Sequence, residues 1–208
     1  MLDSITFLLS GIVFGLAAGL SPGPLLTLVI SETLKHNKKE GFKIAIAPLI
    51  TDLPIIILTI FVISKLSSFN FILGTISIMG AIFIAYLAYE SITIKGINLD
   101  LQKVKAQSFK KGIIANFLSP HPYMFWFVVG APTVLKAFNI NILSAIFFII
   151  GFYFCLVGSK LSVALIVEKS KSFLKSNVYI YTIKLLGLVL LVFAIIFVKN
   201  GLNLFGLI

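Results

Sequence analysis

The sequence predicts an all-α membrane protein with six transmembrane helices, and three observations support this fold class. Hydrophobic residues make up 59% of the 208 positions, and the mean hydropathy is +1.12. Six separate windows are apolar and long enough to cross the roughly 30 Å hydrocarbon core of a bilayer. Lysines gather in alternate connections between these windows. Soluble domains contain only about 45–50% apolar residues, so a bilayer is the expected solvent.

The six predicted helices follow one another with short polar connections. Their approximate bounds are Ile5–Ile30, Phe42–Ile63, Phe69–Ile94, Gly112–Leu135, Ile140–Val167 and Val178–Val198. The first window lacks the basic start of a signal peptide, has the acidic Asp3 before it and is too long for one. No other stretch is long or polar enough to form a soluble domain. We therefore expect residues 1–208 to form a single polytopic membrane domain.

The chain divides into two halves of three helices each. Residues 1–94 and 112–208 form the half-repeats, and a polar, cytoplasmic linker covers residues 95–111. Because each half crosses the membrane three times, the second half enters from the opposite side, so any repeat is an inverted one. The visible sign of the repeat is Leu20-Ser-Pro-Gly-Pro against Leu118-Ser-Pro-His-Pro.

The distribution of lysine predicts the orientation in the membrane. All basic residues are lysine, and twelve of the seventeen follow the first, third and fifth helices: Lys35, Lys38, Lys39, Lys43, Lys95, Lys103, Lys105, Lys110, Lys111, Lys169, Lys171 and Lys175. The opposite connections hold only Lys65, Lys136 and Lys199. Basic residues are enriched in cytoplasmic loops. We therefore expect a multi-pass protein of the cell membrane with both termini outside the cytoplasm.

Several function classes receive no support from the residues. The net charge of +10 is explained by the topology and by anionic lipid, and no groove-reading motif or aromatic-interleaved basic patch indicates nucleic-acid binding. The single Cys155 excludes an intramolecular disulfide. We find no nucleophile–base pair, phosphate loop or Cys/His metal spacing. We therefore expect no enzyme activity, no catalytic residues, no cofactor and no metal site.

Two Ser-Pro pairs predict breaks in the first and fourth helices. Serine is a preferred N-cap and proline is favoured at the first helical position, so Ser21-Pro22 and Ser119-Pro120 are predicted to start half-helices. The start of a half-helix exposes unpaired N–H groups, which suit a carboxylate or another anion. Gly23 and Pro24 belong to the same predicted site. The alternative is a simple proline kink without a ligand.

Asp52 is the strongest single candidate residue. It lies near the middle of the second predicted helix, where an ionised carboxylate costs about 2.5–3.5 kcal/mol on insertion scales. It must therefore face protein or water, and it could exchange a proton or hold the ammonium group of a substrate. The alternative is a structural hydrogen bond to a neighbouring helix break.

Lys160 and His121 are weaker candidates. Lys160 is deeply placed in the fifth predicted helix, where it could pair with Asp52, bind a substrate carboxylate or extend its amine to the membrane surface. His121 stands between two prolines and could relay protons or contact a ligand, or simply pack within the bundle. The aromatic run after it, Tyr123 to Phe127, is expected to pack against lipid or neighbouring helices.

These residues resemble the lysine exporter (LysE/RhtB-type) translocator family. Gly15–Pro24 is similar to the spaced glycines and Pro-Gly-Pro of its first helix, and Asp52 falls where the family carries an aspartate. Gly80–Tyr89 resembles its third helix, and Phe109–Pro120, which includes Asn116, resembles the opening of its fourth. The family has Asn-Pro-Lys where this chain has Ser-Pro-His at 119–121, so that lysine has no counterpart here.

The resemblance implies export of an amino acid or a related small zwitterion, and we expect proton antiport as the mechanism. The expected substrate-binding or coupling residues are Ser21, Pro22, Gly23, Pro24, Asp52, Asn116, Ser119, Pro120, His121 and Lys160. The expected partners are an amino-acid-like substrate, protons and the lipid bilayer, with a homo-oligomer left open. The alternatives are efflux of a metal or another cation, and a membrane scaffold that transports nothing.

Overall fold

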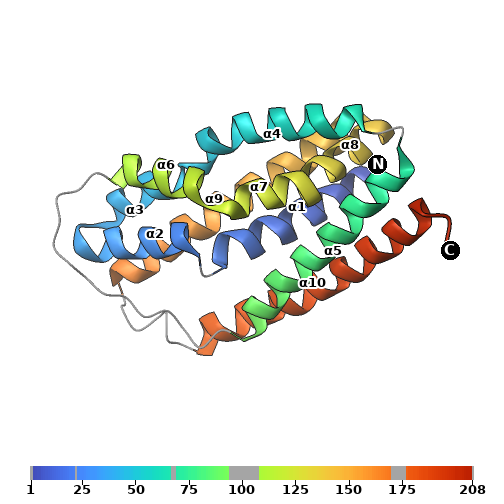
Figure 1. Cartoon of the computed structure of the whole chain (residues 1–208). Helices are drawn as coiled ribbons and strands as arrows, with labels where there is room; N and C mark the ends of the chain where they lie inside the picture. Colours follow the sequence, from blue (N-terminus) through green and yellow to red (C-terminus); the bar gives the residue numbers. More distant parts are fainter. Residues whose placement is uncertain (1, 22, 67–68, 94–107, 170–176, 208) are drawn as a thin grey trace.

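Every regular element that the structure describes is a helix. In this computed structural model the described residues are 2–21, 23–66, 69–93, 108–169 and 177–207. The first half contains α1 (Leu2–Leu20), α2 (Pro24–Lys35), α3 (Lys38–Ala45), α4 (Pro48–Lys65) and α5 (Asn70–Ile92). The second half contains α6 (Ser108–Leu118), α7 (Pro120–Phe125), the π-helix η1 (Trp126–Gly130), α8 (Ala131–Ile140), α9 (Ile142–Lys169) and α10 (Asn177–Leu204). The all-α class is thus confirmed (Figure 1).

The described residues contain five to six candidate membrane crossings. Five stretches are long and apolar enough by themselves: Lys38–Lys65, Asn70–Tyr89, His121–Ile140, Ile142–Lys169 and Lys184–Leu204. A sixth crossing results if α1 and α2, which meet at a 58° bend, form one broken span. The six predicted helices agree with this larger number. The inverted repeat itself remains a prediction.

The fourth predicted window differs from the structure. We predicted Gly112–Leu135, whereas the apolar crossing runs from His121 to Ile140. The reason is the break at Ser119, which separates α6 from the helices that follow. α6 also begins at Ser108, inside the predicted linker. The rest of that linker, residues 95–107, lies outside the described residues.

The outward-facing side chains are apolar, as a lipid environment requires. Ile57 in α4, Phe71 in α5, Phe154 in α9 and Ile195 in α10 are all well exposed on the surface of the bundle. Such side chains are costly to expose to water but not to hydrocarbon. Together with the span lengths, these surfaces describe a multi-pass membrane protein.

Glycines let α1 lie unusually close to α9. Gly11, Gly15 and Gly19 recur every fourth residue and share one face of α1. A Cβ on Gly15 would meet the backbone oxygen of Phe152 and lie 3.0 Å from Cβ of Cys155. Small residues allow such close approach between membrane helices, where packing and hydrogen bonds drive association. α1 and α9 therefore form one tightly packed pair.

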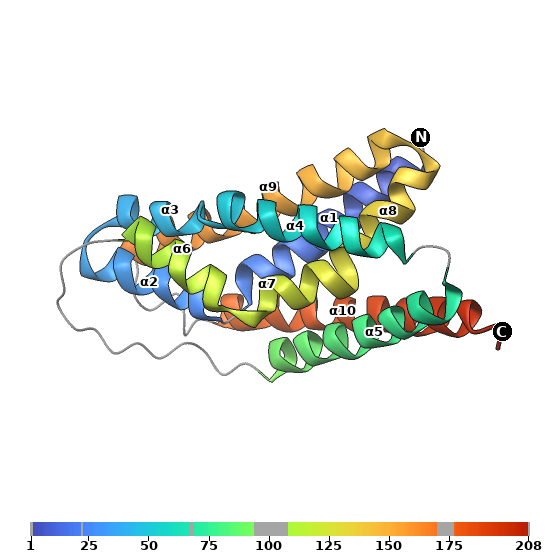
Figure 2. The ribbon, with the colours of Figure 1, turned by 45° about the horizontal axis from the view of Figure 1, so that its top comes forward.

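α5 and α10 form a second pair along one flank of the molecule. Figure 2 shows the two helices side by side, next to the other helices. The hydroxyl of Ser77 in α5 donates a hydrogen bond to the carbonyl of Phe197 in α10 at 2.8 Å. On the inner side of this pair, Phe83 of α5 is buried in the main hydrophobic core.

Charged groups join helices at the end of the bundle where α2 meets α3. Glu32 in α2 is only 1% exposed, and its carboxylate accepts hydrogen bonds from Ser108 at 2.9 Å and from Lys111 at 2.8 Å, both in α6. Lys38 of α3 pairs with Glu168 of α9 at 2.9 Å. The sequence analysis missed Glu32, although a carboxylate just beyond an apolar window is a usable signal.

The close contact between α1 and α9 predicts a strong effect of a single methyl group. Gly15→Ala should lower the melting temperature of the detergent-purified protein, because overpacking against backbone costs about 1–3 kcal/mol. Gly158→Ala is the matched control, since a Cβ on this α9 glycine meets nothing within 4 Å and alanine favours helix. Equal loss in both variants would contradict the contact.

Candidate functional site

The first predicted break is present, but its half-helix starts later than predicted. α1 ends at Leu20 and α2 begins at Pro24. The N-cap is Gly23, with extended backbone (φ −148°, ψ 176°), and not Ser21. The reason is Pro24, because a residue before proline is disfavoured in the helical region. Ser21 instead directly follows the last residue of α1, and its N–H donates to the carbonyl of Ala17 at 2.9 Å. Pro22 lies outside the described residues.

The second predicted break starts where the sequence indicated. α6 ends at Leu118, Ser119 is the N-cap with φ −76° and ψ 131°, and α7 begins at Pro120. The hydroxyl of Ser119 makes no capping hydrogen bond. α7 continues through the π-helix η1 into α8. Trp126 is the first residue of η1, and its ring occupies the space that a Cβ on Gly130, the last residue of η1, would need.

Asp52 receives hydrogen bonds from three other elements. Asp52 itself is only 4% exposed. Oδ1 accepts from the amide of Asn116 in α6 at 2.7 Å. Oδ2 accepts from the hydroxyl of Tyr153 in α9 at 3.1 Å and from the indole N–H of Trp126 at 3.4 Å. All three donors are uncharged, so this shell satisfies the carboxylate without neutralising its charge.

Asn116 also connects Asp52 to its neighbour on the same helix. The Asn116 amide donates to the hydroxyl of Thr51 at 2.7 Å, and that hydroxyl donates to the carbonyl of Ala47 at 3.0 Å. The network therefore holds α4 against α6 just before the second helix break. A structural hydrogen bond, the alternative that we considered for Asp52, is thus present.

Lys160 binds the end of α1 and not Asp52. Its residue is 3% exposed, so the amine does not extend to the membrane surface. Nζ donates to the carbonyls of Gly19 at 2.9 Å and Ala18 at 3.3 Å. These are among the last carbonyls of α1, which have no partner within the helix. Among the described side chains, no ion pair joins Lys160 to Asp52.

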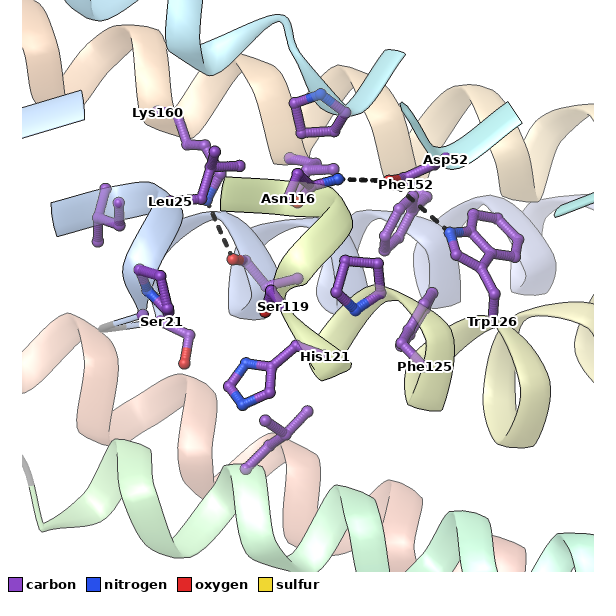
Figure 3. Close-up of a pocket in the computed structure, with 18 of the residues that line it drawn as sticks. Ser21, Leu25, Asp52, Asn116, Ser119, His121, Phe125, Trp126, Phe152 and Lys160 are labelled. Atoms are coloured by element: carbon purple, nitrogen blue, oxygen red, sulfur yellow. Dashed lines mark hydrogen bonds between the residues drawn. The ribbon is translucent and has the colours of Figure 1, made fainter. Parts of the chain in front are cut away.

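Both breaks, Asp52 and Lys160 line one cavity of about 100 Å³, which is room for several water molecules or a small solute. Figure 3 shows Ser21 and His121 on one side of it and Lys160, Asn116 and Asp52 on the other. His121 also brings the two breaks together, because a Cβ on Gly23 would lie 4.0 Å from its Nδ1. The described candidate residues Ser21, Gly23, Pro24, Asp52, Asn116, Ser119, His121 and Lys160 all line this cavity.

Two partners of Asp52 were missed by the sequence analysis. Trp126 is fully buried and packs against Phe152 of α9, one of the two alternatives expected for it, but its hydrogen bond to Asp52 was not predicted. Tyr153 was not singled out, because nothing in an apolar stretch distinguishes a tyrosine that bonds to another helix. In the part of the chain that the structure describes, no three His, Cys, Asp or Glu side chains come together as metal ligands.

One comparison with known proteins gave a match. The family model described as LysE type translocator matches residues 16–201. The matched range contains both helix breaks and every residue of the candidate site. No curated protein and no solved structure matched the chain.

The contacts of Lys160 predict a structural cost for its removal. Lys160→Met should lower the melting temperature in detergent, because buried carbonyls that lose their donor cost about 1–3 kcal/mol. Lys184→Met is the control, since Lys184 is a half-buried lysine of α10 outside the cavity. If both variants melt at the same temperature as the parent, the amine does not cap α1.

Proposed function

The chain belongs to the LysE type translocator family, so it is a transporter of a small-molecule substrate, and we propose that it exports an amino acid or a related small zwitterion in exchange for protons. The observation that carries this proposal is the presence of a carboxylate and an ammonium group in one cavity without an ion pair between them. Asp52 and Lys160 are both buried and both line the cavity between the helix breaks. A zwitterion carries the two complementary charges.

Lys160 and the start of α2 bind the carboxylate of the substrate in this proposal. The amine of Lys160 has three N–H donors, of which two are bonded to the end of α1. The start of α2, with Pro24 at its first position, adds unpaired backbone N–H groups and the positive end of the helix dipole. Ser119, the N-cap of α7, lines the same cavity from the other half of the chain.

Asp52 carries the coupling. Its carboxylate holds either a proton or the ammonium group of the substrate, so the two compete for one group, which produces exchange and not co-transport. An ionised carboxylate only accepts hydrogen bonds, whereas a protonated one must also donate. Protonation therefore weakens the shell formed by Asn116, Tyr153 and Trp126. A ligand shifts a conformational equilibrium only through such a difference between states.

The orientation of the chain is a further part of the proposal. We propose that both termini lie outside the cytoplasm, as the twelve-to-three division of lysines favours. The beginning of α1 and the end of α10 lie at one end of the bundle, and the α2–α3 turn lies at the other (Figure 1). In this orientation Glu32, Lys111 and the other paired charges lie on the cytoplasmic side.

Replacement of Asp52 tests the function directly. In proteoliposomes loaded with labelled amino acids, the parent protein should show transport that an imposed pH gradient drives. Asp52→Asn cannot gain or lose a proton, so this transport should fall to the level of empty liposomes. Tyr153→Phe is the matched control, because it removes one donor to the same carboxylate but leaves the carboxylate able to titrate. It should keep coupling to the pH gradient.

Equilibrium binding separates the two roles of Asp52. If Asp52→Asn still binds the substrate but has lost coupling to the pH gradient, Asp52 carries the proton. If the variant has lost both, Asp52 also binds the ammonium group of the substrate, because a charge-assisted hydrogen bond has become a neutral one. Transport by Asp52→Asn equal to that of the parent would show that the residue is only structural.

Cysteine labelling of intact cells tests the orientation. In a background with Cys155 replaced by alanine, an impermeant maleimide should modify Leu207→Cys, which is well exposed after α10. It should miss Lys39→Cys, which is exposed at the start of α3, until the cells are opened. The reverse pattern would invert the proposed topology.

A further inference from the structure

We infer that the substrate is an amino acid with an uncharged, apolar side chain, and not a basic or acidic one. This inference rests on the proposed function, because it concerns the part of the same cavity that the amino and carboxyl groups of a substrate leave unoccupied. Its evidence is different, since it comes from the remaining cavity wall.

In the proposed function, the two charged side chains that line the cavity bind the α-amino and α-carboxyl groups of the substrate. Among the described lining residues, Asp52 and Lys160 are the acidic and the basic side chain, and His121 is the remaining titratable group. The carboxylate of Asp52 is surrounded by Asn116, Trp126 and Tyr153. A basic side chain would therefore bring a second ammonium group with no second carboxylate to receive it. A buried charge without a partner is strongly unfavourable.

An acidic side chain meets a similar difficulty. Lys160 is its nearest cationic partner, and that amine already bonds to Ala18 and Gly19 and is assigned to the substrate carboxylate. A second carboxylate would have to rely on His121, which stands on the far side of the cavity from Lys160 (Figure 3). The charge pattern thus matches a zwitterion with no additional charge.

Most of the other lining side chains are apolar, and the largest of them come from three helical segments. α5 contributes Phe83 and Leu87, which lie one turn apart on one face; the helix after the second break contributes Phe125 and Trp126; α9 contributes Phe152 and Leu156. The rings of Phe125 and Phe152 are stacked with centroids 4.8 Å apart, and Trp126 meets Phe152 edge-on at 5.5 Å. This continuous aromatic and aliphatic surface favours an apolar side chain, which loses contact with water there.

Counterflow in proteoliposomes tests the inference. The vesicles are loaded with one unlabelled amino acid, and the uptake of the same amino acid in labelled form is measured. Internal leucine, valine or methionine should drive uptake, whereas lysine or glutamate should drive it about tenfold less, the scale on which a binding site discriminates between side chains. If lysine or glutamate drives exchange as well as leucine does, the inference about the side chain is wrong, whereas the proposed export of amino acids still stands. If no amino acid of any charge is exchanged, the proposed function fails as well.

A charge placed in the α5 wall gives a second test. Leu87→Glu should reduce leucine exchange and create lysine exchange, because it supplies the missing carboxylate next to the substrate side chain. Leu87→Gln adds a polar group of similar size without the charge, so it should reduce leucine exchange and gain no lysine exchange. Lysine exchange that is equal in both variants would overturn the assignment of this wall. The counterflow comparison with the parent protein decides the inference even if Leu87→Glu does not fold.

Discussion

The carboxylate of Asp52 has to be surrounded by hydrogen-bond donors, because an ionised acid inside a bilayer costs several kcal/mol. No single helix can supply these donors. They come from α6, from η1 and from α9, through Asn116, Trp126 and Tyr153. One buried charge on α4 therefore fixes the relative positions of four elements. The same carboxylate borders the cavity, so a change in its charge reaches all four at once.

The broken α1 and its close contact with α9 depend on each other. A helix that stops within the bilayer leaves carbonyls without partners. Lys160 on α9 satisfies two of them, at Ala18 and Gly19. Its amine can reach them because the glycine face of α1 allows α9 to approach; a Cβ on Gly19 would occupy the position of the Ser159 hydroxyl. Close packing thus makes the irregular backbone tolerable, and the irregular backbone opens the cavity.

Local features of the sequence were sufficient to predict the fold class, both helix breaks and the burial of Asp52 within the protein. Each of these follows from the chemistry of a few adjacent residues: apolar length, proline, or a charge in an apolar run. The start of α2 at Pro24 could also have been predicted locally, from Gly23-Pro24. We instead placed the start at Ser21-Pro22, because we gave the preference of serine for the N-cap too much weight. The partners of Asp52 and Lys160 could not be predicted, because they depend on how helices distant in the chain pack together.

The π-helix at Trp126–Gly130 has a consequence for the register of the whole segment. A π-turn contains about one residue more than an α-turn, and each residue of an α-helix accounts for about 100° of rotation. Without the additional residue, α8 could keep its contacts only if Trp126 turned away from Asp52 by about a quarter of a circle. Placing the indole beside the carboxylate therefore depends on the number of residues in this segment as well as on their identity. If one residue were deleted here, Trp126 and the residues of α8 could not both keep their present orientation, and the indole would no longer face Asp52.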